Sequence, residues 1–377
     1  MKEDLKDSIN SSSNFLYRCF HDDEKFSLTP RTDSSIYSNI FGFLVANFIK
    51  VDLPDSFYMK LKNEIHQEIL RKLQLFDNYE KLLLSKKDMQ YICFGLSVLK
   101  VLDENILESL VNHFDNSFSF QKHNNKLHSM MTSGTAQTGN LSMFYAIVLI
   151  YLNNYRNKNY EHLIENWEKL HIDSMNHNGF WGDYKFMNHL QFQNGYHQYE
   201  IFSYRKTENI NWDLAAESVY LTSSEDGRFS PYIGGGGCFD YDAIFILTKN
   251  KKLNEKFKEL LIRTRNSILT DQNIDGGHCE SRHIRPVNTN YLINGFNHWI
   301  FSPKGMKRER LRQYITLMRP KHNTVTTHWT KIHRYWEESD LWDTWFRIMT
   351  LAKIDISLGL SSEEEWGFID FPGIGSF

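Results

Sequence analysis

The sequence predicts an all-α protein, specifically an (α/α)6 toroid in which inner and outer helices alternate along the chain. Three observations favour this class: apolar residues recur with helical spacing, strongly apolar segments alternate with amphipathic ones, and a glycine-aromatic turn repeats. The sustained period-two alternation that is typical of strands is missing. Only 7 prolines occur in 377 residues, which permits long helices.

Six segments are apolar on nearly every face, as is typical of helices that are buried on all sides. These expected inner helices are 35–50, 89–102, 139–153, 194–206, 239–249 and 340–356. Amphipathic, charged segments alternate with them and are expected to cover them. These expected outer helices are 56–76, 104–115, 158–173, 210–222, 252–270 and 305–318. Residues 1–34 are polar and rich in serine and aspartate, so we expect a loosely ordered N-terminal arm before a single α/α-toroid domain over 35–377.

A turn that joins glycine to an aromatic residue repeats in the second half of the chain. It occurs at Gly179 in HNGFWGD, Gly227 in EDGRFSP and Gly276 in QNIDGGHCES, with an echo at Trp366-Gly367-Phe368. A period of about 50 residues accommodates one helical hairpin with its loops. We expect each glycine to supply a positive φ and each aromatic ring to fill the gap between neighbouring hairpins.

The composition excludes several classes of function. A net charge of −3, from 43 basic and 46 acidic residues, argues against a polybasic nucleic-acid binder. No apolar run reaches the roughly 18 residues that a transmembrane helix needs, and the polar N-terminus is not a secretory signal. The 4 cysteines are far apart and lack CxxC spacing, which favours a reduced, cytoplasmic setting. No P-loop, GxGxxG, HExxH or GxSxG motif is present, and neither a cofactor nor a metal is expected.

The strongest candidate site is GGGGCFDYDAIFIL, in which glycines 234–237 precede Asp240 and Asp242. Such glycines let the backbone approach a ligand closely at the N-terminus of an inner helix. Two neighbouring carboxyls in a partly dry cavity raise the pKa of one of them, which yields an acid that can donate a proton at neutral pH. Helix capping explains one aspartate, but not the four glycines or the flanking Phe239 and Tyr241.

These features resemble the terpenoid cyclase and protein prenyltransferase superfamily, whose α/α toroids repeat a Q-x-x-D-G-x-(W/F)-G turn. QNIDGG at 272–277 is the nearest match. Class II terpene cyclases open an inner helix with Asp-x-Asp-Asp, and the middle aspartate is the general acid. Asp240 and Asp242 fill the first and third places, and Ala243 replaces the last aspartate. The resemblance therefore implies Asp242 as the acid, assisted by Asp240. Asp242 and Asp343 stand where prenyltransferases have cysteine and histidine ligands, so no zinc site is expected.

A second polar segment is QNGYHQYEIF, in which Tyr196, His197 and Glu200 share one helical face. Asn194, His197 and Tyr199 resemble the Asn, His and Tyr groups of toroidal polysaccharide lyases, where Asn and His neutralise a uronate and Tyr transfers the proton. We therefore take His197 as a catalytic candidate and the other four as substrate contacts. The alternative is a buried hydrogen-bond network.

The segment TNYLINGFNHWIF offers Asn294 and His298 as substrate-binding candidates. Uncharged amides beside aromatic rings suit sugar hydroxyls, or a polar cap over an apolar ligand. A solvated polar loop is the alternative. The basic residues of 303–321 are expected to form a solvated outer face.

The late segment SDLWDTWFR places Asp343 and Arg347 at i and i+4, where they can pair. A buried arginine can grip a carboxylate or phosphate. The rings of Trp342 and Trp345 can stabilise a carbocation or stack on sugars. We take Asp343 as a catalytic candidate and the other three, with Tyr241, as substrate-binding candidates. The alternative is an internal salt bridge that locks two helices together.

Three hypotheses remain from the sequence. The first is a terpenoid-cyclase-like enzyme in which Asp242 protonates an isoprenoid-type substrate in an aromatic-lined cavity. The second is a carbohydrate-active toroid, a lyase, epimerase or hydrolase that acts on an acidic glycan. The third is a non-catalytic toroid that binds a ligand. The expected partner is a small molecule or an oligosaccharide, and the substrate and the oligomeric state stay open.

Overall fold

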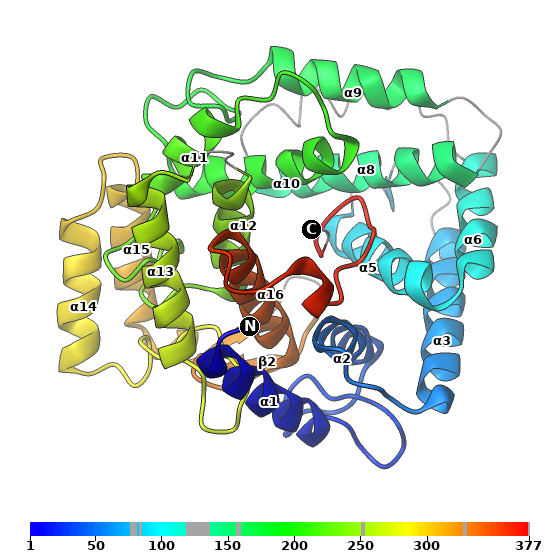
Figure 1. Cartoon of the computed structure of the whole chain (residues 1–377), viewed down its shortest axis with the longest axis horizontal. Coiled ribbons are helices and arrows are strands. Elements are labelled where there is room, and N and C mark those ends of the chain that lie inside the picture. Colours follow the sequence, from blue (N-terminus) through cyan, green and yellow to red (C-terminus); the bar gives the residue numbers. More distant parts are fainter. Residues whose placement is uncertain are drawn as a thin grey trace. The chain divides into compact units, whose positions relative to one another are not determined.

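The computed structural model describes residues 1–75, 81–82, 85–117, 136–155, 160–249, 253–326 and 330–375. Within these ranges the chain forms fourteen α-helices, two short 3-10 helices and a two-stranded antiparallel sheet (Figure 1). The all-α class predicted from the sequence is confirmed. Contacts group the chain into two compact units, each assembled from three separate segments: unit 1 is 1–53, 184–189 and 212–367, and unit 2 is 54–183, 190–211 and 368–377. The expectation of one domain over 35–377 stays a prediction.

Unit 1 is organised around two buried helices that pack against each other, α12 and α16. Its helices are α1 (Glu3–Arg18), α2 (Ile36–Ile49), α11 (Trp212–Tyr220), α12 (Gly237–Thr248), α13 (Glu255–Thr270), α14 (Thr289–Ile300), α15 (Lys307–Leu317) and α16 (Leu341–Ser357). Helices α2 and α13 pack on α16, and α11 packs on α12. The 3-10 turns Pro320–His322 and Glu363–Glu365 and the strands β1 (Thr324–Thr326) and β2 (His333–Tyr335) complete this unit.

Unit 2 is organised around α5 and α8, which pack against each other and carry many buried side chains. Its helices are α3 (Asp55–Leu75), α5 (Lys86–Leu102), α6 (Glu104–Ser117), α8 (Ala136–Tyr155), α9 (Glu161–Asp173) and, except for its first residue, α10 (His189–Arg205). Helix α3 packs on α5, and α9 packs on α8. All twelve segments predicted as helices are helical over most of their length, and apolar and amphipathic helices alternate as expected in both units.

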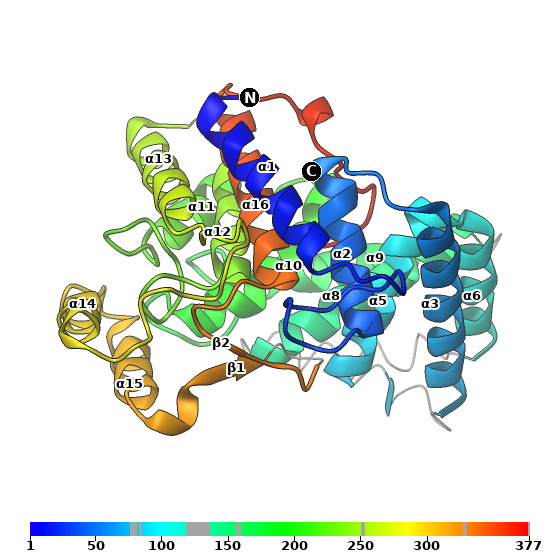
Figure 2. The same cartoon turned by 90° about the horizontal axis from the view of Figure 1, so that it is seen from below.

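The N-terminal arm is the main difference from the expected fold. Residues 3–18 form α1, which packs against α2, α13 and α16 (Figures 1 and 2). Its buried face carries Ser8 and Ser12 as well as Leu5 and Phe15. The expectation of a loosely ordered arm is therefore wrong. The helix is hard to recognise in the sequence because two serines occupy buried positions where an amphipathic helix usually has large apolar residues.

The repeated turns have the geometry that the sequence predicts. Gly179, Gly227 and Gly276 have φ values of 81°, 82° and 90°. In each turn the glycine N–H donates to the carbonyl oxygen three residues earlier, at 2.9–3.0 Å. Phe180 directly follows Gly179, and Phe229 lies two residues after Gly227. Both phenylalanines are fully buried. The turns therefore form equivalent closed loops, each of which leads toward the start of a helix.

Among the helices that the structure describes, none combines the length and the apolar character needed to cross a membrane.

Candidate functional site

Helix α12 begins in the glycine tetrad, and its first turn carries Asp240, which is fully buried. Oδ2 of Asp240 accepts hydrogen bonds from Arg228 Nη1 at 3.0 Å and from Arg347 Nη1. Oδ1 accepts from the backbone N–H of Phe229 at 2.9 Å. Two guanidinium groups thus fix the position of the Asp240 carboxyl. This placement favours a positioning role for Asp240 over the catalytic role that the sequence suggested.

The space beside the glycine tetrad is taken by the protein's own side chains. A Cβ atom at Gly236 would lie 2.5 Å from Glu280 Oε1, and one at Gly237 would lie 2.8 Å from Asp343 Oδ1. The Gly237 N–H donates to Asp343 Oδ1 at 3.2 Å. The sequence predicted that these glycines admit a ligand, but at these two positions they admit internal carboxyls. The partial positive charge of the helix N-terminus is bound by Asp343.

Arg334, on β2, is the shared cation of three carboxyls. Its side chain is fully buried; Nη2 donates to Glu280 Oε2 at 3.0 Å and to Asp343 Oδ2 at 2.8 Å, and Nε donates to Asp340 Oδ2. Burial and the neighbouring Asp343 raise the pKa of Glu280 to about 7, and burial raises the pKa of Asp340. Because one guanidinium serves three carboxyls, the group retains a proton near neutral pH. Glu280 Oε1 also accepts from the Tyr232 hydroxyl.

The i, i+4 ion pair that the sequence predicted on α16 is not formed. Asp343 pairs with Arg334, whereas Arg347 pairs with Asp240 on α12 and also donates to Gly235 O at 2.9 Å. The internal salt bridge between helices, which the sequence left as an alternative, is therefore present. We call Arg228, Arg334, Arg347, Asp240, Asp340, Asp343 and Glu280 the arginine-carboxylate cluster.

Asp242 lies on α12 two residues beyond Asp240, and its side chain is 4% exposed. Cys238, in the first turn of the same helix, lies in the electrostatic field of both Asp242 and Glu280. Burial, followed by these two carboxyls, raises the pKa of the Cys238 thiol. Asp242 from α12 and Glu280 from a distant loop thus both lie near the Cys238 thiol. The spacing of these residues in the sequence did not indicate this.

The predicted substrate-binding rings pack on one another. The ring centroids of Trp342 and Trp345 lie 4.8 and 4.9 Å from that of Phe346, and the centroid of Tyr241 lies 5.5 Å from it. Phe41, on α2, extends this aromatic cluster at 4.9 Å from Trp342. All five rings are buried. They therefore form a buried aromatic cluster between α2, α12 and α16.

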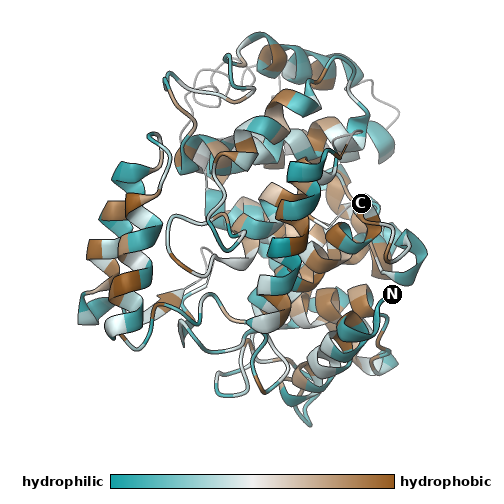
Figure 3. Ribbon diagram, turned by 60° about the vertical axis from the view of Figure 1, so that its left-hand side comes forward, coloured by the Kyte–Doolittle hydropathy of each residue, from teal (hydrophilic) through white to brown (hydrophobic). Residues whose placement is uncertain are grey.

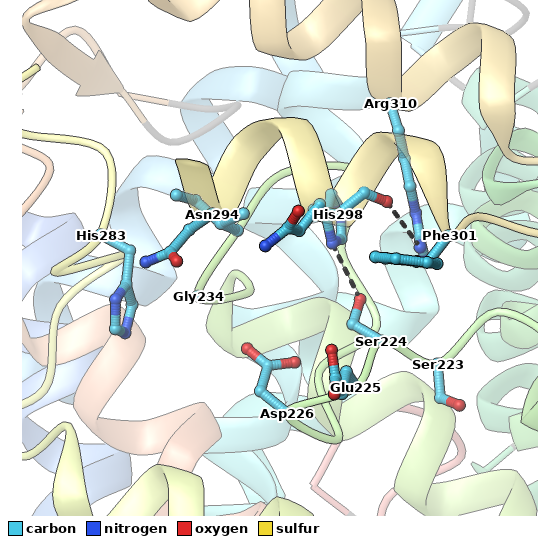
Figure 4. Close-up of a pocket in the computed structure, with 12 residues that line it drawn as sticks. Ser223, Ser224, Glu225, Asp226, Gly234, His283, Asn294, His298, Phe301 and Arg310 are labelled. Atoms are coloured by element: carbon cyan, nitrogen blue, oxygen red, sulfur yellow. Dashed lines mark hydrogen bonds between the residues drawn. The ribbon is translucent and has the colours of Figure 1, made fainter. Parts of the chain in front are cut away.

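A polar pocket of about 720 Å³ opens beneath α14, and we call it the α14 pocket (Figure 4). Its lining residues are Ser223, Ser224, Glu225, Asp226, Ile233, Gly234, His283, Asn294, Asn297, His298, Phe301 and Arg310. The carboxylates of Glu225 and Asp226 lie across the pocket from Asn294 and His298 (Figure 4). The sequence predicted Asn294 and His298 as ligand contacts, and both line this pocket.

Two titratable side chains of the α14 pocket have pKa values that are shifted toward the neutral form. Asp226 faces the pocket, and partial desolvation by the surrounding protein raises the pKa of its carboxyl. His298 Nδ1 lies 3.2 Å from Ser224 Oγ, and burial, followed by Arg310, lowers the pKa of His298 to about 3. Asp226 and Ser224 were not predicted from the sequence, although the repeated turn at Gly227 pointed to their loop.

Arg310 lines the same pocket with a side chain that is 3% exposed. It donates to Thr222 O at 2.7 Å, to Ser302 Oγ at 3.2 Å and to His189 Nε2 at 3.2 Å. Within the described ranges no carboxylate forms an ion pair with it. Burial lowers the pKa of Arg310 to about 10. The sequence carried no signal for this buried cation, because it lies within a run of basic residues.

The α14 pocket and the arginine-carboxylate cluster share a wall. Gly234 lines the pocket, and its carbonyl oxygen accepts from Arg347 Nη2 at 3.3 Å. His283, also in the wall, lies 3.2 Å from Asp271 Oδ2, and Asp271 pairs with Arg228 at 2.7 Å. A ligand in the pocket would therefore lie one layer of residues away from the charges that hold α12.

In unit 2 the predicted polar face of α10 forms a buried hydrogen-bond network with α8. Asn194 Oδ1 accepts from Thr138 Oγ1 at 3.2 Å and from the Gly139 N–H. His197 Nε2 lies 2.6 Å from Asn140 Nδ2. This is the buried hydrogen-bond network that the sequence left open as the alternative to a substrate site.

The remaining residues of that face are also buried. Tyr196 and Glu200 are 0% exposed, and a Glu200 carboxylate oxygen lies 3.6 Å from His197 Nδ1. The Tyr199 hydroxyl donates to Gly179 O at 2.6 Å, and burial raises its pKa. Tyr199 thus supports the Gly179 turn, which favours a structural role over proton transfer.

In the described part of the chain, no group of three or more His, Cys, Asp or Glu side chains is placed to hold a metal ion.

No family model matches this sequence, and no curated protein matches it. One solved structure to which the chain is similar is a variant of the type II terpene cyclase MstE from Scytonema, in complex with its substrate geranylgeranyl dihydroxybenzoate. The identity is 11% and the TM-score is 0.49, over 95% of this chain and 98% of that one.

Proposed function

We propose that the protein is an enzyme of the terpenoid-cyclase type in which Asp242 protonates an isoprenoid-type substrate. The observation that supports this proposal is the anchoring of Asp240 by Arg228 and Arg347 at the start of α12. Both oxygens of Asp240 are occupied by Arg228, Arg347 and the N–H of Phe229. Of the two aspartates at the start of α12, Asp242 is therefore the proposed donor, and Asp240 positions the helix.

The surroundings of α12 suit the chemistry that follows protonation. Proton addition to a carbon-carbon double bond leaves a carbocation, and ring closure passes that charge to another carbon until a proton is lost. The rings of Tyr241, Trp342 and Phe346 offer negative π faces to such a cation. The Glu280–Tyr232 pair holds a further proton nearby, from which the donor can be reloaded.

The proposal predicts that the purified protein converts a linear isoprenoid, or its diphosphate, into a cyclic isomer of the same mass. Asp242→Asn is expected to lower the rate by a factor of about 10²–10⁴, because the general acid is lost while the side-chain size is kept. Product mass and retention time in coupled chromatography and mass spectrometry check both statements.

Asp213→Asn is the matched control, because Asp213 is an exposed acid in the first turn of α11. It is expected to keep the wild-type rate. Turnover by Asp242→Asn at the wild-type rate, or no product from any linear isoprenoid tried, would exclude this function.

The α14 pocket supports a second candidate, a carbohydrate-active enzyme that acts on an acidic glycan. Amides and carboxylates that face each other across the pocket suit sugar hydroxyls (Figure 4). Arg310 offers a cation for a uronate carboxylate, and Asp226, whose pKa is raised, suits the role of general acid.

This second candidate predicts turnover of a polyuronate, seen as new reducing ends or as the ultraviolet absorbance of an unsaturated uronate. Asp226→Asn is expected to reduce that turnover about 10²-fold or more, because a general acid is removed. Asp213→Asn again serves as the control. Full activity of Asp226→Asn would remove this assignment.

A further inference from the structure

Helix α14 has an inverted amphipathic pattern. In most globular proteins the apolar face of such a helix packs on the core and the polar face meets solvent. In α14 the polar residues Asn294 and His298 line the pocket, and Tyr291 and Gly295 are buried against the α15 side. At about 100° per residue, the large apolar residues fall together on the opposite face. They are Leu292, Ile293, Phe296, Trp299 and Ile300.

This face is open to solvent in the structure. Leu292, Ile293, Phe296 and Ile300 are 42%, 53%, 47% and 37% exposed. The ring centroids of Phe296 and Trp299 lie 5.5 Å apart, so the aromatic side chains form one continuous patch. Figure 3 shows apolar bands along the α14–α15 hairpin at the left of the view. A contiguous exposed patch of this kind marks an interaction surface.

Basic side chains border the apolar face. Residues 285–321 contain eight lysines and arginines and one glutamate, in a chain whose net charge is −3. Lys304, Lys307, Arg308 and Arg312 are exposed on the α14–α15 loop and on α15. In the part of the chain that the structure describes, no carboxylate pairs with any of these four. A solvated basic face was expected here from the sequence. Because these basic side chains border an exposed apolar face, they can instead contact an anionic surface.

We propose that the α14–α15 hairpin docks on an anionic lipid surface. The apolar face of α14 would lie at the boundary between headgroups and acyl chains, and Lys304, Lys307 and Arg308 would contact the anionic headgroups. A second copy of this chain is a poorer occupant, because it would bring two positively charged hairpins together. The opposite side of α14 lines the α14 pocket, so docking places that pocket beside the lipid surface.

Sedimentation of the full-length protein with vesicles tests this proposal. Vesicles of phosphatidylcholine mixed with phosphatidylserine should bind the protein at least about tenfold more tightly than phosphatidylcholine alone, and added salt should weaken the binding. Phe296→Ser should weaken binding about tenfold by removing buried apolar area. Lys307→Glu combined with Arg308→Glu should weaken it about tenfold or more by reversing charge.

Two exposed positions elsewhere are the matched controls. Met59→Ser on α3, where the side chain is 57% exposed, and Arg263→Glu on α13 should both leave vesicle binding unchanged. Circular dichroism establishes that each variant is folded. The proposal would be overturned if Phe296→Ser and the Lys307→Glu/Arg308→Glu double variant bound vesicles as tightly as the wild type. It would also be overturned if the wild-type protein bound neither kind of vesicle. A concentration-dependent dimer that Phe296→Ser abolishes would also overturn it, in favour of a second copy of the chain.

Discussion

Replacement of Arg334 by alanine is expected to lower the free energy of unfolding by about 3–5 kcal/mol at neutral pH. Arg334 is fully buried and is hydrogen-bonded to Glu280, Asp340 and Asp343. Its removal leaves three buried carboxyls without their shared cation. The carboxyls can lower this cost by taking up protons, so the loss of stability should be smaller at mildly acidic pH. Denaturant unfolding at several pH values measures both effects.

The matched control is Arg31→Ala. Arg31 also pairs with a glutamate, Glu338, at 2.8 Å, but the side chain of Arg31 is 63% exposed. Solvent screens such a pair, so the substitution should cost at most about 1 kcal/mol. Equal losses for Arg31→Ala and Arg334→Ala would contradict the view that the arginine-carboxylate cluster is a buried electrostatic support of unit 1.

Glu280 is expected to make the wild-type protein less stable as the pH rises from about 4.5 to about 7. The pKa of Glu280 is raised from 4.5 to about 7, so in this window the folded state holds a proton that the unfolded state has lost. Stability therefore falls with rising pH across the window. Glu280→Gln removes the titration, and its stability relative to the wild type should increase by roughly 3 kcal/mol between the two ends. Paired denaturation curves at pH values across the window measure this change.

Glu255→Gln, at a glutamate whose side chain is 82% exposed, is the control for this pH series. A stability difference between Glu280→Gln and the wild type that does not vary with pH would show that Glu280 does not hold the proton of the cluster. A group that titrates near neutral pH can both donate and recover a proton, as the reloading role proposed for the Glu280–Tyr232 pair requires.

Much of the helical organisation could be predicted because the spacing of apolar residues within each segment indicates which faces of a helix are buried. Residues 239–249 are apolar on nearly every side, and α12 is buried over almost its whole length. Residues 56–76 carry one apolar stripe, and α3 buries that stripe alone. The Gly227 and Gly276 turns were predictable because a positive φ favours glycine.

Helices α1 and α14 could not be predicted as reliably. Both depart from the rule that an apolar stripe faces the core. Helix α1 uses Ser12 on its buried face, where the hydroxyl donates to Gly276 O at 3.1 Å. Helix α14 turns polar residues inward and leaves Phe296 in solvent. The residue pattern of one segment does not specify which part of the chain packs against each of its faces.

The candidate site was predicted only in part for the same reason. Asn294 and His298 line a pocket as expected, and Asp240 and Asp242 are buried at the start of α12. The role of each charge depends on its partner, and the partner of Asp240 includes Arg347, 107 residues away.

The sequence by itself determined the twelve predicted helical segments, the places of the repeated turns and the polar residues that lie near the start of α12. These properties depend on spacing and on backbone preference, which act over a few residues. Only the tertiary structure decided that Asp240 is locked, that Glu280 shares a proton with its neighbours and that the apolar face of α14 is left open. Charge and solvation are set by whatever is close in space, and in this fold those neighbours come from distant parts of the chain.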